Sequence, residues 1–413
     1  MEGANVNRFR PVRVPGHHPT EEPPLDPNQT LYPTFSDQEV SRRHDLTRAL
    51  IDDLGLDGLV VFGWSAQNRA AQADVYYLSG YMGMRDNYVL FPGEGEPILF
   101  AQSYNHVPNA ADVSFLHDVR WGGVDNGQTI GEELLGRGLG KVGVVGWMPY
   151  QHYESMRRVA GDAISFRDVT PSYRRIRLKK SPEELDWLRR GAEFTDAALA
   201  GLRDALRPGV KESLLAESIE AAYLGDGGLT GFYYLASTPM SAPTRSVPAQ
   251  VLSNREIAAG DVVSCEISIS YAGYAGQGLR TFTVSAEPTP QIAELHNVAL
   301  EVYREVAAAI RPGAGVEDVW AASDSIADHG FSIRDGLVHG FGIGLLPPSI
   351  RTRATTHGVD DDWVFEAGET IVIQPNVITE DETVGVQVGE LCVVTDEGAR
   401  SLHTFPMELI RAG

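Results

Sequence analysis

Apolar and polar residues recur with helical and strand periods between residues 36 and 178. Asp37 to Leu54 has apolar residues at helical spacing, and residues 150–159 form a second helical stretch. Short apolar runs typical of buried strands occupy residues 58–63, 75–78, 88–91, 97–100 and 142–145. This alternation of helix and strand predicts an α/β domain with a mostly open sheet.

Residues 1–35 lack any such period. They are rich in Pro, Asn, His and charged residues, which predicts an extended arm or a disordered tail. An arm that packs across a neighbouring subunit has the same composition, so both interpretations stay open.

A basic segment, residues 174–180, precedes the second half of the chain. We interpret it as a solvated interdomain strand rather than a phosphate-binding patch. Ser181, Pro182 and Glu184 then form the signature of a helix start with a capping box. These signals place a domain boundary near Lys179, between domains of residues 36–178 and 179–413.

The second half contains an internal repeat. Leu206-Arg-Pro-Gly recurs as Ile310-Arg-Pro-Gly, so that Arg311 lies 104 residues (311 − 207) after Arg207. Each copy follows a long helical stretch and precedes a shorter amphipathic one and then strands. Two such halves, related by pseudo-twofold symmetry, would place both helix layers on one curved sheet.

Residues 261–284 predict a β-hairpin that carries an acidic residue in an apolar strand. Gly273 and Gly276 mark the turn between a run around Glu266 and a return strand at residues 280–284. A carboxylate is costly to bury without partners. Glu266 is therefore expected to have hydrogen-bond partners or a chemical task.

Composition narrows the class of partner. The chain has 413 residues and a net charge of −22, which argues against binding nucleic acid or anionic membranes. Cys265 and Cys392 both lie in apolar runs and are interpreted as core residues. The sequence has no signal-peptide pattern and no apolar run long enough to span a bilayer, so we expect a cytoplasmic protein.

The hairpin resembles the core of the pita-bread family, which includes methionine aminopeptidase, aminopeptidase P, prolidase and creatinase. The resemblance is carried by Gly260-Asp261, Gly273-Tyr274 and Arg280-Thr281-Phe282. It implies a creatinase-like α/β N-terminal domain, followed by an α+β pita-bread domain with a pseudo-twofold internal repeat. It also implies a homodimer with an active site shared between subunits.

The family's five metal-ligand positions fall on residues that form a poor ligand set. The resemblance places Glu266, Gln277, His339, Gln374 and Gly389 there. Two divalent cations need several carboxylates, so we expect no metal and no other cofactor. Glu390, next to Gly389, is expected to point away from the site because neighbouring side chains on a strand face opposite ways.

This pattern resembles creatinase and ectoine hydrolase, the metal-independent branch of the family. Creatinase's catalytic histidine falls here on Ala249, and its two guanidinium-binding glutamates fall on Leu279 and Gln374. Creatine itself is therefore not the expected substrate. The resemblance instead places a substrate carboxylate between Arg85 and Arg351, where a bidentate arginine clamp would bind it.

Each candidate residue also has a structural interpretation. Glu266 is a general base or nucleophile in the functional interpretation, and a buried carboxylate bonded to Arg280 or Gln277 in the structural one. His339 is a proton carrier in the functional interpretation and a core histidine in the structural one. Gln277 and Gln374 suit recognition of an amide or carbonyl group, or packing in the core. Arg85 could form a surface ion pair instead, Arg353 could replace Arg351, and Tyr234 is a core residue or lines the cleft.

Three functions are compatible with these residues. The first is a metal-independent hydrolase of a C–N bond in a small carboxylate-bearing amide, amidine or cyclic substrate. The second is a catalytically silent pita-bread protein that binds a ligand or partner. The third is an Xaa-Pro-type metallopeptidase with a reorganised metal site.

Overall fold

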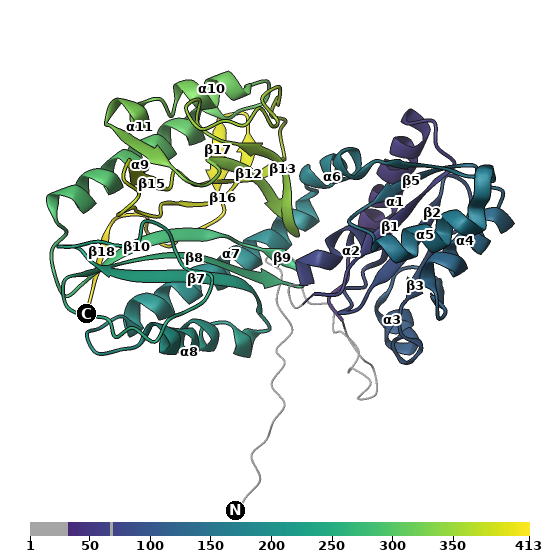
Figure 1. The fold of residues 1–413 in the computed structure, drawn as a ribbon, viewed down its shortest axis with the longest axis horizontal. Coiled ribbons are helices and arrows are strands. Elements are labelled where there is room, and N and C mark those ends of the chain that lie inside the picture. Colours follow the sequence, from purple (N-terminus) through teal and green to yellow (C-terminus); the bar gives the residue numbers. More distant parts are fainter. Residues whose placement is uncertain (1–31, 67–68) are drawn as a thin grey trace, which may run out of the picture. The chain divides into compact units, whose positions relative to one another are not determined.

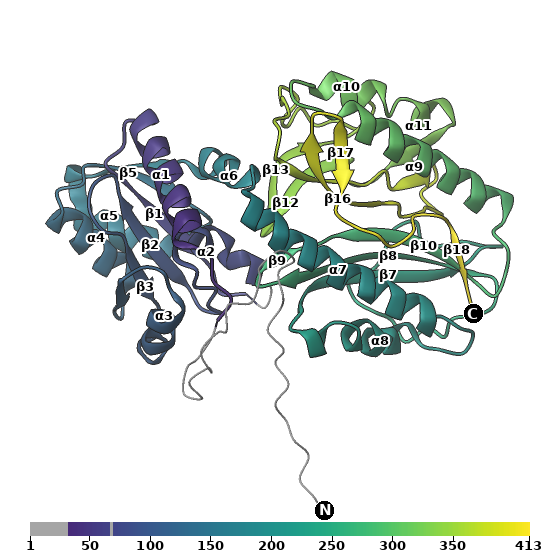
Figure 2. The same ribbon diagram turned by 180° about the vertical axis from the view of Figure 1, so that it is seen from behind.

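The structure, a computed structural model, describes residues 32–66 and 69–413. The predicted arm at residues 1–35 therefore lies almost entirely outside the described residues. From Phe35 onward the chain builds two lobes, an N-lobe and a C-lobe, each around its own sheet (Figure 1; Figure 2). Among the described residues, no helix combines the length and the apolar character that crossing a membrane requires.

The N-lobe is a six-stranded mixed sheet in the order β4-β3-β2-β1-β5-β6. Alternate residues of its central strands enter different cores: Leu59 and Val61 pack with α1, α2 and α6, whereas Val60 and Phe62 pack with α4 and α5. This is the predicted α/β domain. Its elements are α1 Asp37–Asp53, β1 Gly58–Gly63, α2 Ala73–Ser79, β2 Asn87–Pro92, β3 Ile98–Ala101, α3 Val107–Val113, β4 Asp118–Trp121, α4 Asn126–Gly136, β5 Lys141–Val145, α5 Tyr150–Ala160, β6 Ser165–Asp168 and α6 Thr170–Leu178.

Two local predictions for this lobe are wrong. Residues 75–78 are helical, within α2, and the basic segment 174–180 is mostly the helix α6, which has Pro171 in its first turn. Short apolar runs have no period long enough to distinguish a buried helix from a strand. The basic segment is not solvated either, because Arg177 and Lys180 are buried.

The C-lobe is a curved sheet in the order β13-β12-β14-β16-β10-β8-β7, with β9, β17 and β18 attached. The helices α7 and α8 pack on the β7-β8-β10 half, and α9 to α11 pack on the β12-β14-β16 half. Its elements are α7 Pro182–Ala205, α8 Leu215–Ala221, β7 Leu229–Pro239, β8 Asp261–Tyr271, β9 Tyr274–Ala275, β10 Gly278–Val284, α9 Pro290–Ala309, α10 Val316–Ala321, α11 Ser325–Asp328, β11 Phe331–Ile333, β12 Val338–Gly342, β13 Gly344–Ile350, β14 Thr370–Ile373, β15 Val377–Thr379, β16 Gly389–Thr395, β17 Gly398–Ser401 and β18 Ile410–Ala412.

The internal repeat is visible in the backbone hydrogen bonds after each long helix. Gly209 N donates to Ile257 O in the first copy, and Gly313 N donates to Phe365 O in the second, over 2.8 and 2.9 Å. Each copy then forms an isolated antiparallel bridge, Lys211 with Glu256 and Gly315 with Val364. The two halves of the C-lobe therefore share one local architecture, as the repeat predicts.

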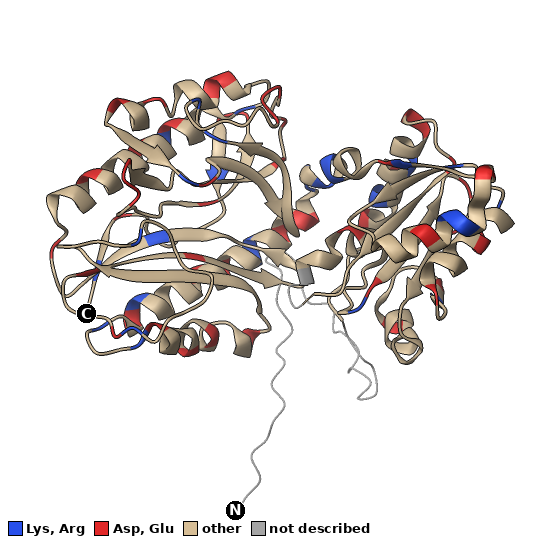
Figure 3. Cartoon of the chain, in the orientation of Figure 1, with Lys and Arg blue, Asp and Glu red and all other residues tan. Residues whose placement is uncertain are grey.

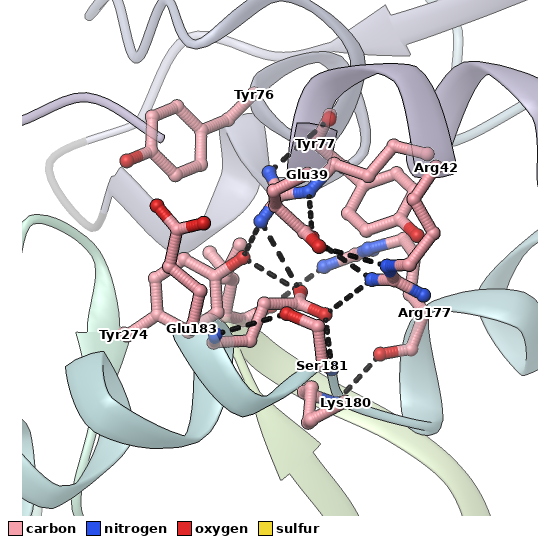
Figure 4. A network of polar contacts seen from close by, with 12 residues as sticks. Glu39, Arg42, Tyr76, Tyr77, Arg177, Lys180, Ser181, Glu183 and Tyr274 are labelled. Carbon is pink, nitrogen blue, oxygen red and sulfur yellow. Dashed lines mark hydrogen bonds and ion pairs between the residues drawn. The ribbon is translucent and has the colours of Figure 1, made fainter. Parts of the chain in front are cut away.

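A buried ionic network joins α1 of the N-lobe to α7 and β9 of the C-lobe (Figure 4). Arg43, which is fully buried, contacts Glu39 at 2.7 Å and donates to the Tyr274 hydroxyl at 2.7 Å. That hydroxyl donates to Glu184, which also accepts from Arg42. Glu184 and Ser181 form the predicted capping box, so the start of α7 is fixed both locally and by the N-lobe.

Candidate active site

Glu266 lies in the middle of β8, and its immediate partner is Gln277. The amide Nε2 of Gln277 donates to Glu266 Oε1 at 2.7 Å. Arg280, the other partner considered, pairs in register with Cys265 and so faces the opposite side of the sheet. Its guanidinium bonds to Glu390 and to backbone carbonyls instead. Of the two predicted partners of Glu266, the structure therefore has Gln277 and not Arg280.

Gln277 and Gln374 link Glu266 to His339, from β8 on one half of the sheet to β12 on the other. Gln277 Nε2 lies 3.4 Å from Gln374 Oε1, and His339 Nε2 lies 3.3 Å from the same oxygen. We call these four residues the polar chain. All four were predicted as site residues, and the structure brings them together.

Asp335 fixes the orientation of the polar chain. The Gln374 amide nitrogen donates to Asp335 Oδ2 at 3.3 Å and to Gly336 O at 3.1 Å, so the Gln374 oxygen must face His339 and Gln277. His339 Nδ1 lies 3.2 Å from Gly340 O, so each ring nitrogen faces an oxygen acceptor, and a neutral ring can donate to only one of the two. Sequence reasoning missed Asp335, because it lies in a loop before β12 and matches no quoted motif.

Burial and charge perturb both titratable members of the polar chain. Desolvation, assisted by the negative charge of Asp335, raises the pKa of Glu266 to about 8, although the hydrogen bond from Gln277 opposes this. Desolvation lowers the pKa of His339 below its ordinary value. At neutral pH both groups are therefore mainly uncharged.

Gln277 has an unused acceptor. Its side-chain oxygen is buried and has no hydrogen-bond partner among the described residues. The residue as a whole is only 2% exposed. A buried acceptor without a donor is costly, so this oxygen is an unfavourable feature of the polar chain.

A cavity of about 450 Å³ lies beside strands that carry the polar chain; its wall includes Tyr234, Ser268 and Phe341 but none of the four residues of the polar chain. Tyr234 pairs with Glu266 across β7 and β8, and the Phe341 ring lies 5.7 Å from that of His339. A bulge in β7 between Thr230 and Phe232 precedes Tyr234, whose ring stacks on Phe232. Tyr234 thus lines the cavity, as the second of its two interpretations expected.

The two predicted carboxylate-binding arginines are not part of this arrangement. Arg85 is exposed and does not line the cavity. Arg351 donates to the backbone oxygens of Thr355 and Arg334 at 2.9 and 2.8 Å. Arg353 pairs with Glu317. The role expected for Arg85 concerns the active site of a partner subunit and stays a prediction.

Comparison with known proteins identifies the family. Residues 186–396 match Peptidase_M24, the metallopeptidase family M24, and residues 43–179 match the creatinase/prolidase N-terminal domain. The chain belongs to metallopeptidase family M24. The suspected pita-bread family and the predicted fold class are both confirmed.

Relatives of this M24 protein are named as peptidases. It is 26% identical over 88% of its length to 98% of an uncharacterized peptidase, YqhT, of Bacillus subtilis (strain 168). It is 28% identical over 91% of its length to 97% of a probable dipeptidase, PepE, of Mycobacterium bovis. The prolidase from Pyrococcus horikoshii OT3 has the same fold, with a TM-score of 0.74 at 22% identity, covering 89% of this chain and 100% of that one.

These relatives overturn the first function expected from the sequence. A metal-independent hydrolase of a non-peptide C–N bond is contradicted, because the similar proteins are named peptidases and dipeptidases and the family is one of metallopeptidases. The broader expectation of a hydrolytic enzyme agrees with those names. The changed residues at the family's metal-ligand positions suggested the metal-independent branch, whereas the motifs around them match the family as a whole.

The residues of this M24 protein nevertheless do not fit a pair of metal ions. No group of three or more His, Cys, Asp or Glu that could hold a metal occurs in residues 32–66 and 69–413. Glu390 is bound to Arg280 and Tyr303, away from the polar chain, as predicted. At Gly389 a Cβ atom would lie 2.4 Å from Ile373 O and 2.8 Å from Gln374 Cα. A longer ligand side chain therefore has no room there unless the backbone moves.

Proposed function

We propose that this M24 protein hydrolyses small peptides, with the peptide bond lying over the polar chain of Glu266, Gln277, Gln374 and His339. The observation that carries the proposal is the hydrogen-bonded continuity of these four residues beside a cavity. The names of the relatives, peptidase and dipeptidase, support the substrate class.

The chemistry follows from the protonation of Glu266. Its pKa of about 8 lies close to an ordinary working pH, where a carboxylate is an efficient general base toward water. The ionised Glu266 would remove a proton from the water that attacks the peptide carbonyl carbon. Gln277 Nε2 holds the carboxylate in position through its 2.7 Å hydrogen bond.

Peptide hydrolysis needs a proton on the leaving nitrogen. Glu266 would deliver the proton taken from water to that nitrogen as the C–N bond breaks, which leaves a free amine and a carboxylic acid. His339 is the other group of the polar chain that can exchange a proton, and Gln374 sets its orientation. No metal ion takes part in these steps, because the His, Cys, Asp and Glu residues of the described chain do not form a ligand set for one.

A panel of dipeptides tests the proposal, with release of free amino acids followed by mass spectrometry at pH 8.5. The expected result is release by the wild-type protein and a rate lower by about a hundredfold or more in Glu266→Gln, the scale of losing general-base assistance. Glu380→Gln, an exposed glutamate after β15, is the matched control. Equal release by wild type and Glu266→Gln would contradict the proposal.

A second candidate, a peptide-binding protein without turnover, is favoured by one observation. The backbone around Gly389 leaves no room for a metal-binding side chain at that position. At two further metal-ligand positions of the family this chain has the amides Gln277 and Gln374. Dipeptide binding without release of amino acids, unchanged over pH 6–9, would select this candidate.

A further inference from the structure

Hydrolysis of a peptide bond needs a hydrogen-bond donor for the carbonyl oxygen. When water adds to the carbonyl carbon, the π electrons of the C=O bond move onto the oxygen, which becomes an oxyanion. A donor at that oxygen stabilises the transition state more than the ground state and so raises the rate. Ionised Glu266 is an acceptor only and cannot fill this role. We therefore searched the neighbourhood of Glu266 for a donor.

The two amides of the polar chain have no hydrogen to offer. Gln277 Nε2 donates to Glu266 at 2.7 Å, and it also lies 3.4 Å from Gln374 Oε1. Gln374 Nε2 donates to Asp335 Oδ2 at 3.3 Å and to Gly336 O at 3.1 Å. Because an amide has two N–H donors, both side chains are fully engaged.

The neighbouring imidazole and hydroxyl are engaged as well. His339 has ring nitrogens 3.2 Å from Gly340 O and 3.3 Å from Gln374 Oε1. Ser268, in the cavity wall, donates through Oγ to Gly276 O at 2.8 Å. Each of these groups would have to give up a hydrogen bond within the protein before it could donate to a substrate.

The two arginines of the cavity wall are also committed elsewhere. Arg174 donates to Asp74 Oδ2 through Nε and Nη2, at 3.2 and 2.9 Å. Arg177 donates to Ile343 O at 3.0 Å, past the end of the strand β12 that carries His339. They therefore lie at the far end of the cavity from the polar chain.

Tyr234 is the donor that remains. It pairs in register with Glu266 between β7 and β8, so the two side chains share a face of the sheet, with Cβ atoms about 5 Å apart. The strand β7 has no Lys, Arg, Asp or Glu (Figure 3), so hydroxyl groups are its strongest side-chain donors. Tyr234 lines the cavity, and its hydroxyl makes no hydrogen bond to another residue in 32–66 or 69–413.

The ring of Tyr234 is held in place by its neighbour. It stacks on Phe232, with ring centroids 4.6 Å apart and planes 20° apart. A phenol keeps its proton up to about pH 10. Burial, together with the negative charge of Glu266, raises the pKa of Tyr234 further. The hydroxyl is therefore a positioned donor over the whole range in which Glu266 acts as a base.

We propose that Tyr234 is a further catalytic residue, whose hydroxyl donates a hydrogen bond to the oxyanion. The inference rests on the proposed function, in which Glu266 takes a proton from water. The water oxygen bonds to the carbonyl carbon, and the carbonyl oxygen gains the displaced electron pair beside Tyr234, which keeps its proton. The C=O bond then re-forms, the C–N electron pair leaves with nitrogen, and Glu266 returns the proton to that nitrogen.

The first test compares Tyr234→Phe with Tyr233→Phe. Tyr233 is the matched control, because it faces the other side of the sheet and donates to Glu220 at 2.8 Å. For a cleaved dipeptide, Tyr234→Phe should lower kcat by about a hundredfold and leave KM nearly unchanged, since the donor acts in the transition state. Tyr233→Phe should keep the wild-type kcat. An unchanged kcat in Tyr234→Phe, a rise in KM alone, or an equal fall in both variants would overturn the inference.

The second test does not depend on turnover. Calorimetry at pH 7, where Glu266 mainly holds its proton, measures binding of a phosphinic dipeptide analogue whose tetrahedral P–O⁻ group replaces the peptide carbonyl. Losing a hydrogen bond to a charged group costs about tenfold to a hundredfold in affinity, so Tyr234→Phe should bind the analogue that much more weakly than wild type and Tyr233→Phe. Equal affinity in all three proteins would overturn the inference.

The two tests separate this inference from the proposed function. Turnover that falls in Glu266→Gln but not in Tyr234→Phe would remove the role of Tyr234 alone. A wild-type protein that releases no amino acids, yet binds the phosphinic analogue through the Tyr234 hydroxyl, would remove the proposed function and keep Tyr234 as the donor to a tetrahedral oxygen.

Discussion

Glu266→Gln should make the protein more stable at alkaline pH. The pKa of Glu266 is raised from 4.5 to about 8 by burial and by Asp335. Between these two values the folded chain keeps the proton while the unfolded chain has lost it. The free energy of unfolding therefore falls as pH rises through this window, and the neutral amide avoids the loss.

The size of the effect follows from the shift. Each pKa unit corresponds to about 1.4 kcal/mol, which sets an upper limit of about 5 kcal/mol above pH 8. Glu266 is partly exposed, and solvent screening reduces this cost, so we expect about 2–4 kcal/mol. Near pH 4.5 the wild type and the variant should differ little, because both carry an uncharged side chain at residue 266.

Urea unfolding at pH 5, 7 and 9 measures the difference, with Glu380→Gln as a control for changing a glutamate on the surface. The Glu266→Gln curve should separate from the wild-type curve progressively from pH 5 to pH 9, and the Glu380→Gln curve should not. A difference between wild type and Glu266→Gln that is the same at all three pH values would refute the reasoning about the protonated carboxyl group of Glu266.

Three further outcomes are expected. The kcat/KM for a cleaved dipeptide should rise with pH and level off above about pH 8, because the ionised Glu266 is the base; a rate that falls across this range would show that the acid form acts instead. Glu184→Gln should destabilise the protein by about 3–5 kcal/mol in chemical unfolding, because it leaves the buried Arg43 with one anionic partner fewer, whereas the neighbouring Glu183→Gln should cost much less. Dialysis against a chelator should leave the melting temperature unchanged, since the described residues form no metal-ligand cluster; a drop of many degrees that zinc or manganese reverses would contradict this.

Local signals in the sequence were reliable where the chain's own neighbours decide the structure. The capping box of Ser181 and Glu184, the hairpin around Gly273 and the repeat at Arg207 and Arg311 all depend on residues close in sequence, and all are present. The four residues of the polar chain were also predictable, because the resemblance places each of them at a metal-ligand position of the family.

Long-range contacts decided the features that were missed. Residues 174–180 have the composition of a charged linker. Asp74, about 100 residues earlier, forms ion pairs with Arg174 and Arg177, and these contacts help to pack α6 against the N-lobe. Asp335 could not be found by motif, because its relevance comes from its contact with Gln374. In both cases the deciding partner is distant in sequence, where neither period nor spacing gives a signal.

The most direct test of the central claim is dipeptide turnover and binding measured on the same preparations of wild type and Glu266→Gln. We expect the wild type to release amino acids at pH 8.5, and the variant to bind the dipeptide with similar affinity while turning it over about a hundredfold more slowly or less. Undiminished turnover in a folded Glu266→Gln protein would contradict the account and place the chemistry elsewhere in the molecule.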